Sequence, residues 1–159
     1  MTRYWTHYWK QKTVREHKIY EGVGLAHIGG EQFHDRGVTK GDVVYCVSLT
    51  QKGAVLLLAR LRADMVTTKA VAKKRFPGDE VWDATEHLID ESDDSDLIEL
   101  RFDRVIKRSV LEKLEFITNA GHSTIKFRGS GVDKQSLRKV RELTEGSAVL
   151  LDKILDAGN

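Results

Sequence analysis

The chain has 159 residues, of which 40% are hydrophobic and 31% are charged, with a formal net charge of +2 at pH 7. This composition excludes a disordered chain, and the single cysteine, Cys46, excludes an intrachain disulfide framework. The sequence contains no apolar run of signal-peptide or membrane-spanning length. We therefore expect one domain over residues 1–159, in the cytoplasm and without a membrane partner.

The net charge averages an uneven distribution. Residues 90–96 hold five acidic residues and no basic one, which predicts a solvated loop. Basic residues are concentrated instead near the start of the chain, where Lys10, Lys12 and Arg15 follow an aromatic-rich segment. Phosphates attract cations and exposed bases stack on flat side chains, so this segment favours nucleic-acid binding. The alternative is that the aromatics belong to the core and the lysines only maintain solubility.

The first elements follow from side-chain alternation and glycine spacing. Residues 3–9 alternate with aromatic side chains on both faces, which predicts a strand inside a sheet. Residues 10–30 have poor periodicity and four glycines, which predicts a long loop that passes close to another part of the chain. One or two helical turns should follow over residues 31–36, ended by Gly37 in the left-handed conformation.

The middle of the chain predicts a hairpin followed by a helix. Residues 43–49 and 54–63 are nearly continuous apolar runs separated by a turn, as expected of two buried neighbouring strands. A helix is expected over residues 67–76, capped by Thr67 or Thr68 and stopped by the Pro77–Gly78 pair. Trp82 then lies in a loop over residues 79–84.

The last part of the chain predicts three further strands and three helices. The strands are expected over residues 86–90, 97–106 and 124–128. A short helix should begin at Ser109, and closing helices are expected over residues 133–143 and 145–157, the last capped by Thr144. The whole order predicts an α+β fold, a small barrel of five or six mostly antiparallel strands with helices packed around it.

No local motif predicts catalysis, a cofactor or a metal. The Gly22-Val23-Gly24 start of a dinucleotide fingerprint has His27 where the third glycine is needed. The sequence holds neither a phosphate-binding loop nor a nucleophile elbow, and its six histidines and Cys46 lack metal-ligand spacing. We therefore expect a protein that is not an enzyme and that has no cofactor.

Four segments resemble one known family. They are residues 4–9 (YWTHYW), 33–45 (FHDRGVTKGDVVY), 81–84 (VWDA) and the closing stretch from IKFRG at residues 125–129 through SLRKV at residues 136–140. These segments are similar to the EVE-type branch of the PUA-like superfamily, whose relatives include the YTH and ASCH domains. The similarity extends over essentially the whole chain.

The resemblance implies a PUA-like pseudobarrel that binds nucleic acid and accepts a flipped base, often a modified one, into an aromatic pocket. A flipped base must regain stacking and must satisfy its polar edge. On this reading the base-binding residues are Trp5, Trp9, His27, Gln32, Phe33, Trp82 and Asp83, and the phosphate-binding residues are Lys10, Lys12, Arg15 and Arg36.

Departures from the family and alternative roles are also evident. Where relatives often carry an asparagine-rich stretch this chain has Gly-Glu-Gln-Phe at residues 30–33, so either Gln32 supplies the amide or the recognised edge of the base differs. The alternatives are Trp5 as pure core, Trp82 as a packing anchor and Arg36 as a surface charge.

The expected function is recognition of a methylated or hydroxymethylated cytosine or adenine, in DNA or RNA, with any nuclease or effector supplied by a separate chain. The alternatives are an RNA-binding domain without modified-base selectivity, or a small-molecule sensor or enzyme that uses the same pocket, with His27 and Asp83 as its polar groups.

Overall fold

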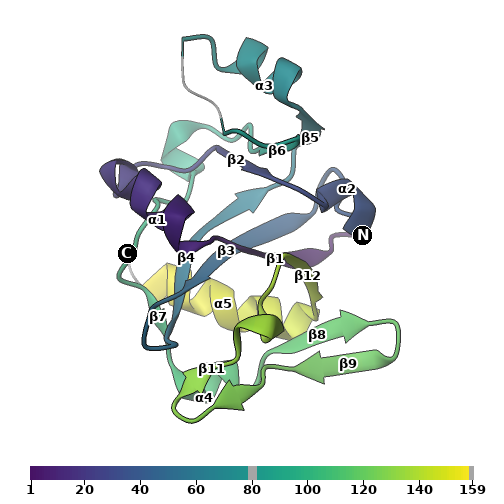
Figure 1. Ribbon diagram of the computed structural model, residues 1–159. Helices are drawn as coiled ribbons and strands as arrows, with labels where there is room; N and C mark the ends of the chain where they lie inside the picture. The colour runs from purple at the N-terminus through teal and green to yellow at the C-terminus, as the bar shows by residue number, and fades with distance from the viewer. Residues whose placement is uncertain (79–81, 158–159) are drawn as a thin grey trace.

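The computed structural model describes residues 1–78 and 82–157, and they form an α+β fold around a curled, mixed seven-stranded sheet (Figure 1). The order across this sheet is β7-β4-β3-β1-β12-β8-β9. Its strands are β1 (Tyr4–Tyr8), β3 (Val43–Leu49), β4 (Val55–Arg62), β7 (Val105–Ile106), β8 (Glu115–Thr118), β9 (Gly121–Thr124) and β12 (Val140–Leu143).

Two smaller sheets complete the fold. A three-stranded sheet has the order β2-β6-β5, and β10 pairs with β11. In Figure 1 the three-stranded sheet lies with α3 at one end of the molecule, and the β8–β9 hairpin extends at the other. The strands are β2 (His27–Gly30), β5 (Met65–Thr68), β6 (Glu86–Ile89), β10 (Phe127–Arg128) and β11 (Gly131–Val132).

Five α-helices and three 3₁₀ turns connect the strands within the described residues. The helices are α1 (Gln11–His17), α2 (Phe33–Arg36), α3 (Lys69–Arg75), α4 (Arg108–Leu111) and α5 (Glu145–Ala157). The turns are η1 (Lys18–Tyr20), η2 (Asp94–Asp96) and η3 (Lys134–Ser136). Over the described ranges no helix has both the length and the apolar character needed to cross a membrane.

The position of β1 inside the sheet confirms the expectation from its aromatic alternation. It pairs in parallel with β3 and antiparallel with β12, so the large sheet is mixed. Trp5 and Trp9 enter one apolar core with Val44 and Cys46 of β3. Tyr4 and Tyr8 pack against a second core on the opposite face, which α5 closes with Leu151 and Leu155.

Several capping and strand predictions are also confirmed. The strands β3 and β4 form the predicted hairpin, and Gly37 ends α2 with a φ of 98°. The Oγ1 atom of Thr68 accepts a hydrogen bond from the Val71 amide at the start of α3. At the start of α5 the amide of Ser147 donates to Thr144 Oγ1.

Four predicted elements were wrong in type or extent. The predicted loop over residues 10–30 contains α1 and β2, although Gly29 and Gly30 do pass close to other side chains. The predicted strand over residues 97–106 is regular only at β7, because its first part instead bonds irregularly to neighbouring loops, as in the Gly24–Glu99 bridge. The last predicted strand, over residues 124–128, is reduced to β10.

The fourth correction changes the architecture most. The predicted helix over residues 133–143 is the turn η3 followed by strand β12, because its apolar Val140 and Leu143 pair with β1 in the sheet. The β8–β9 hairpin was not predicted. The described residues contain twelve strands rather than five or six, because many of the strands are too short to give an alternating pattern in the sequence.

Candidate functional site

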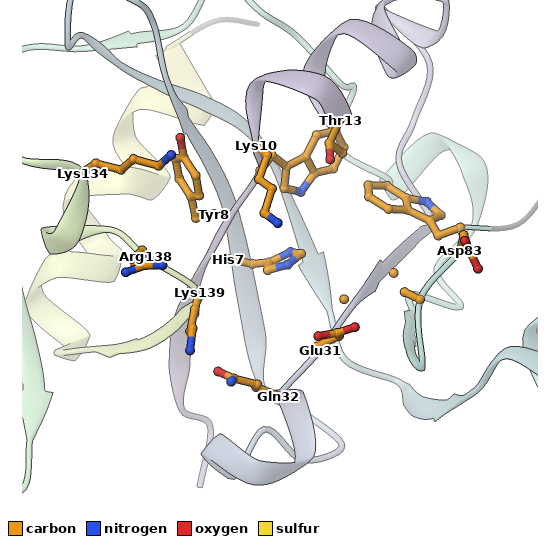
Figure 2. A pocket seen from close by; sticks show the side chains of 15 residues that line it. His7, Tyr8, Lys10, Thr13, Glu31, Gln32, Asp83, Lys134, Arg138 and Lys139 are labelled. Atoms are coloured by element: carbon orange, nitrogen blue, oxygen red, sulfur yellow. The ribbon is translucent and has the colours of Figure 1, made fainter.

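A cavity of about 410 Å³ opens on the face of β1 that carries Trp5, His7 and Trp9 (Figure 2). Its lining comes from the end of β1, from α1, from β2 and the segment after it, from the segment before β6, and from η3 and the segment between η3 and β12. The lining residues are His7, Tyr8, Trp9, Lys10, Thr13, Gly29, Gly30, Glu31, Gln32, Trp82, Asp83, Ala84, Lys134, Arg138 and Lys139.

His7 lies in the middle of the view, with Lys134, Arg138 and Lys139 on one side and Asp83 on the other (Figure 2). Its ring packs edge-on against Phe33 at a centroid distance of 4.9 Å, and it is only 7% exposed. Burial lowers the pKa of His7 to about 4, so the imidazole is neutral at pH 7. Its Nδ1 atom is buried without a hydrogen-bond partner among the described residues. A neutral ring of this kind can donate or accept one hydrogen bond to a ligand.

Trp82 forms an aromatic wall of the cavity. Its indole stacks on His17 with a centroid distance of 4.3 Å and meets Trp9 edge-on at 4.9 Å. A Cβ atom added at Gly29 would lie 2.3 Å from the Cβ of Trp82, far inside van der Waals contact. Glycine at position 29 is therefore what allows β2 to approach this wall so closely.

Two residues of the lining have strained backbones. Gln32 and Lys139 have φ angles of 75° and 64°, and they are the two non-glycine residues with positive φ in the described part of the chain. The left-handed conformation is unfavourable for such residues, and strain of this kind concentrates at functional sites. The Oε1 atom of Gln32 is also buried without a hydrogen-bond partner among residues 1–78 and 82–157.

A group of four exposed cations surrounds the cavity. None of them forms an ion pair within 4.0 Å of a carboxylate in the part of the chain that the structure describes. The cations, which we name the basic rim, are Lys10, Lys134, Arg138 and Lys139. The Lys134 ammonium lies over the Tyr8 ring at 5.8 Å from its centroid. Of the two acidic lining residues, Glu31 is exposed and Asp83 is bound to Lys69 at 3.1 Å.

The cavity brings together five of the predicted site residues, namely Lys10, Trp9, Gln32, Trp82 and Asp83. Of these, Trp9 is only 1% exposed and contributes mainly to the core beneath the cavity. Its indole Nε1 has no hydrogen-bond partner among the described residues and lies close to the Cys46 thiol. The surface available to a ligand therefore comes chiefly from the other four residues.

Three predicted base-binding residues lie outside the cavity lining. Trp5 is 2% exposed, and its indole N–H donates to Asp42 Oδ2 at 3.0 Å. Phe33 is fully buried and supports His7 from the core. His27 stacks on Phe76, and its Nε2 lies 2.7 Å from His87 Nδ1. Each of these side chains therefore has a packing or hydrogen-bonding role of its own in the fold.

Three predicted phosphate-binding residues also lie outside the lining. Lys12 and Arg15 are exposed on α1, where Lys12 lies 3.8 Å from Glu16. Arg36 is the last residue of α2 and lines a different cavity, which it shares with Trp5.

Sequence reasoning missed two parts of the site. His7 was visible as a member of the Trp5–His7–Trp9 face of the first strand, and that alternation could have identified it. Lys134, Arg138 and Lys139 were assigned to a helix, which puts Lys134 and Arg138 on one face but does not predict that this face lies beside β1. No local pattern indicates that the chain instead turns at Lys139 and places these cations beside β1.

The described residues include no group of three or more His, Cys, Asp or Glu side chains that could hold a metal ion. Comparison with known proteins found no matching family model, no matching curated protein and no matching solved structure.

Proposed function

We propose that this protein is a nucleic-acid-binding module that accepts one base into the cavity beside β1, on a fold of the PUA-like pseudobarrel type. The curled mixed sheet is compatible with that fold, and the sequence resemblance favours it. The module acts by binding, and any chemistry on the nucleic acid belongs to a separate chain.

The observation that carries the proposal is the division of the cavity into a neutral interior and a charged rim. The interior offers the Trp82 indole for stacking, together with the neutral imidazole of His7 and the Gln32 amide. The rim offers cations without carboxylate partners among the described residues. A nucleotide has the same division, because its base is flat and neutral and its phosphates are anionic.

The unpartnered polar atoms support a base rather than an apolar ligand. A buried polar atom without a hydrogen bond costs about 1–3 kcal/mol, so the free protein tolerates a cost at His7 Nδ1 and Gln32 Oε1. The polar edge of a base can supply both a donor and an acceptor. A base that turns these two side chains toward the cavity would remove a cost that an apolar molecule leaves in place.

The affinity for nucleic acid tests the proposal directly. We expect fluorescence anisotropy to detect binding of short labelled DNA or RNA strands, with tighter binding when one base is methylated or hydroxymethylated. The slope of log affinity against log salt should be about −0.7 per phosphate contact on single strands. Equal affinity for all bases would reject modified-base recognition, and binding of a neutral small molecule with no salt dependence would favour the sensor alternative.

Two pairs of variants test the contributions of the cavity interior and of the basic rim to binding separately. Trp82→Ala should weaken binding roughly 5- to 150-fold, since stacking contributes about 1–3 kcal/mol per base. The matched aromatic control is Phe127→Ala, because Phe127 packs against the opposite core. Lys139→Glu should weaken binding of every sequence and reduce the salt slope, whereas Lys153→Glu on α5 should leave both unchanged. Unchanged binding in Trp82→Ala would reject the base cavity.

A further inference from the structure

A second cavity, of about 400 Å³, lies beside the other end of β1. It occupies a wedge in the large sheet, because β12 pairs with β8 only at Leu143 and Phe116 before the two strands separate. The end of α2 and the β8–β9 hairpin complete its walls. The lining residues are Arg3, Trp5, Arg36, Ile117, Thr118, Asn119, Val140, Arg141 and Glu142.

The charges around this wedge do not balance. Three arginines face one carboxylate, and that carboxylate, Glu142, is already bound by Arg3 through two hydrogen bonds of 2.9 Å and 2.6 Å. Arg36 and Arg141 have no carboxylate within 4.0 Å among the residues that the structure describes. The wedge therefore presents two uncompensated guanidinium groups.

Arg141 is held in place by the fold rather than free in solvent. Its Nη1 atom donates to the Ser136 carbonyl at 2.5 Å and its Nη2 atom donates to Ser123 Oγ at 2.7 Å. The guanidinium also lies over the Phe116 ring, 4.1 Å from its centroid. Burial lowers the pKa of Arg141, and the charge of Arg36 lowers it further. A half-buried cation that is fixed beside a second cation is an unfavourable arrangement unless an anion compensates it.

We propose that this wedge binds a phosphate group, with Arg36 and Arg141 as its ligands. Guanidinium groups suit phosphate because their planar donors match its oxygen atoms and can bond in pairs. Arg141 provides a fixed donor. Arg36 is exposed, and its guanidinium has no hydrogen-bond or ion-pair partner among residues 1–78 and 82–157. The phosphate belongs either to a nucleic-acid strand or to a small phosphorylated molecule, and both sources present the same group. The site stands independently of the base cavity, because the two cavities share no lining residue.

The test uses the full chain and two probes. In the first arm, sodium phosphate is titrated at constant ionic strength while ¹H–¹⁵N spectra follow the arginine side chains and the amides of residues 117–119 and 140–142. In the second arm, a labelled oligonucleotide is titrated by anisotropy. The variant is Arg36→Gln, whose side chain forms no hydrogen bond to residues 1–78 and 82–157, and the control is Lys153→Gln, an exposed cation on α5 outside both cavities.

Saturable shifts at these groups with phosphate, lost in Arg36→Gln and kept in Lys153→Gln, would establish the site for a free phosphate group. A loss of about tenfold in oligonucleotide affinity, with the salt slope reduced by about 0.7 to 0.9, would assign it to a backbone phosphate. No phosphate-induced shift combined with unchanged oligonucleotide affinity in Arg36→Gln would overturn the proposal. If no oligonucleotide binds at all, the proposed function is rejected. The phosphate titration still tests whether the wedge binds phosphate.

Discussion

The two faces of the large sheet differ in the hydrogen bonds that their buried polar side chains make. On the face closed by α5, the buried Tyr45 hydroxyl donates to Asp152 at 2.8 Å, and Arg60 reaches the same carboxylate at 2.6 Å. On the face that carries the cavity, His7 Nδ1 and Gln32 Oε1 are buried without partners among the described residues. The face closed by α5 also buries one unpartnered atom, Thr6 Oγ1, but Thr6 lines neither cavity, whereas His7 and Gln32 both line the cavity beside β1. The difference separates residues that stabilise the fold from residues that we propose to bind.

The largest effect is expected on the closed face. Leu151→Ala should lower the free energy of unfolding by about 2–5 kcal/mol, because Leu151 is fully buried in the core beneath α5. Urea denaturation measures this loss. Nucleic-acid affinity of the folded fraction should not change, and a loss of affinity would show that the two faces are coupled.

A pH dependence should arise on the cavity face. The pKa of His7 is about 4 in the folded protein and near 6.5 when unfolded, so the unfolded chain binds the proton first as the pH falls. The stability associated with neutral His7 should be complete above pH 6.5 and lost towards pH 4, by about 3 kcal/mol. Urea denaturation at pH 7 and pH 4.5 measures the loss.

His7→Gln should reduce this dependence, and the exposed His34→Gln is the control. Some dependence should remain in His7→Gln, since burial also lowers the pKa of His27 and of His87. An unchanged dependence in His7→Gln would contradict the assignment of a buried neutral imidazole.

Two glycines allow the faces to be compared with one type of substitution. Gly29→Ala should destabilise the fold by about 1–3 kcal/mol and weaken nucleic-acid binding, because its Cβ would collide with Trp82. Gly146→Ala should stabilise α5 by up to about 1 kcal/mol, because nothing lies within 4 Å of that Cβ. Thermal unfolding and anisotropy measure both quantities. Full affinity in Gly29→Ala would show that Trp82 need not keep its position.

The smallest expected effect concerns the strained backbone. Lys139→Gly should stabilise the fold by up to about 1 kcal/mol, because glycine adopts a φ of 64° without the steric cost. It should also weaken nucleic-acid binding by removing a cation of the basic rim. Lys134→Gly removes a cation from a turn with ordinary backbone, so it should weaken binding with no gain in stability. A Lys139→Gly variant that is more stable and binds nucleic acid with unchanged affinity would show that binding needs neither the strained backbone nor the cation at this position.

The sequence predicts the parts of the fold that carry a repeated pattern. The continuous apolar runs of β3 and β4 and the amphipathic stripe of α5 were located nearly to the residue. By contrast, residues 133–143 hold only two fully buried side chains that reach β1, Val140 and Leu143, and their spacing fits a helix as well as a strand. Pairing with a strand from the other end of the chain decides between the two, and no local window contains that information.

The candidate site was also predictable only in part. Trp9, Gln32, Trp82 and Lys10, which line the cavity, were named because the family resemblance implies an aromatic pocket beside the first strand with cations near it. The rest of the basic rim depends on the turn at Lys139. The backbone there has a strained positive φ, and the turn places these cations beside β1. Trp5 and Trp82 both lie in the segments that resemble the family, but Trp5 is buried whereas Trp82 is partly exposed.

The pairing of β1 with β12 has a consequence for how the protein is made. A ribosome releases β1 well before β12, yet these strands are neighbours in the sheet, and the segment just before β12 lines the cavity together with the end of β1. Contacts so distant in sequence form slowly, because a long loop must close before they stabilise the chain. Both strands of the β3–β4 hairpin are available early, but the cavity beside β1 is incomplete until synthesis has passed Lys139. A partly made chain therefore lacks the cavity that we propose as the binding site.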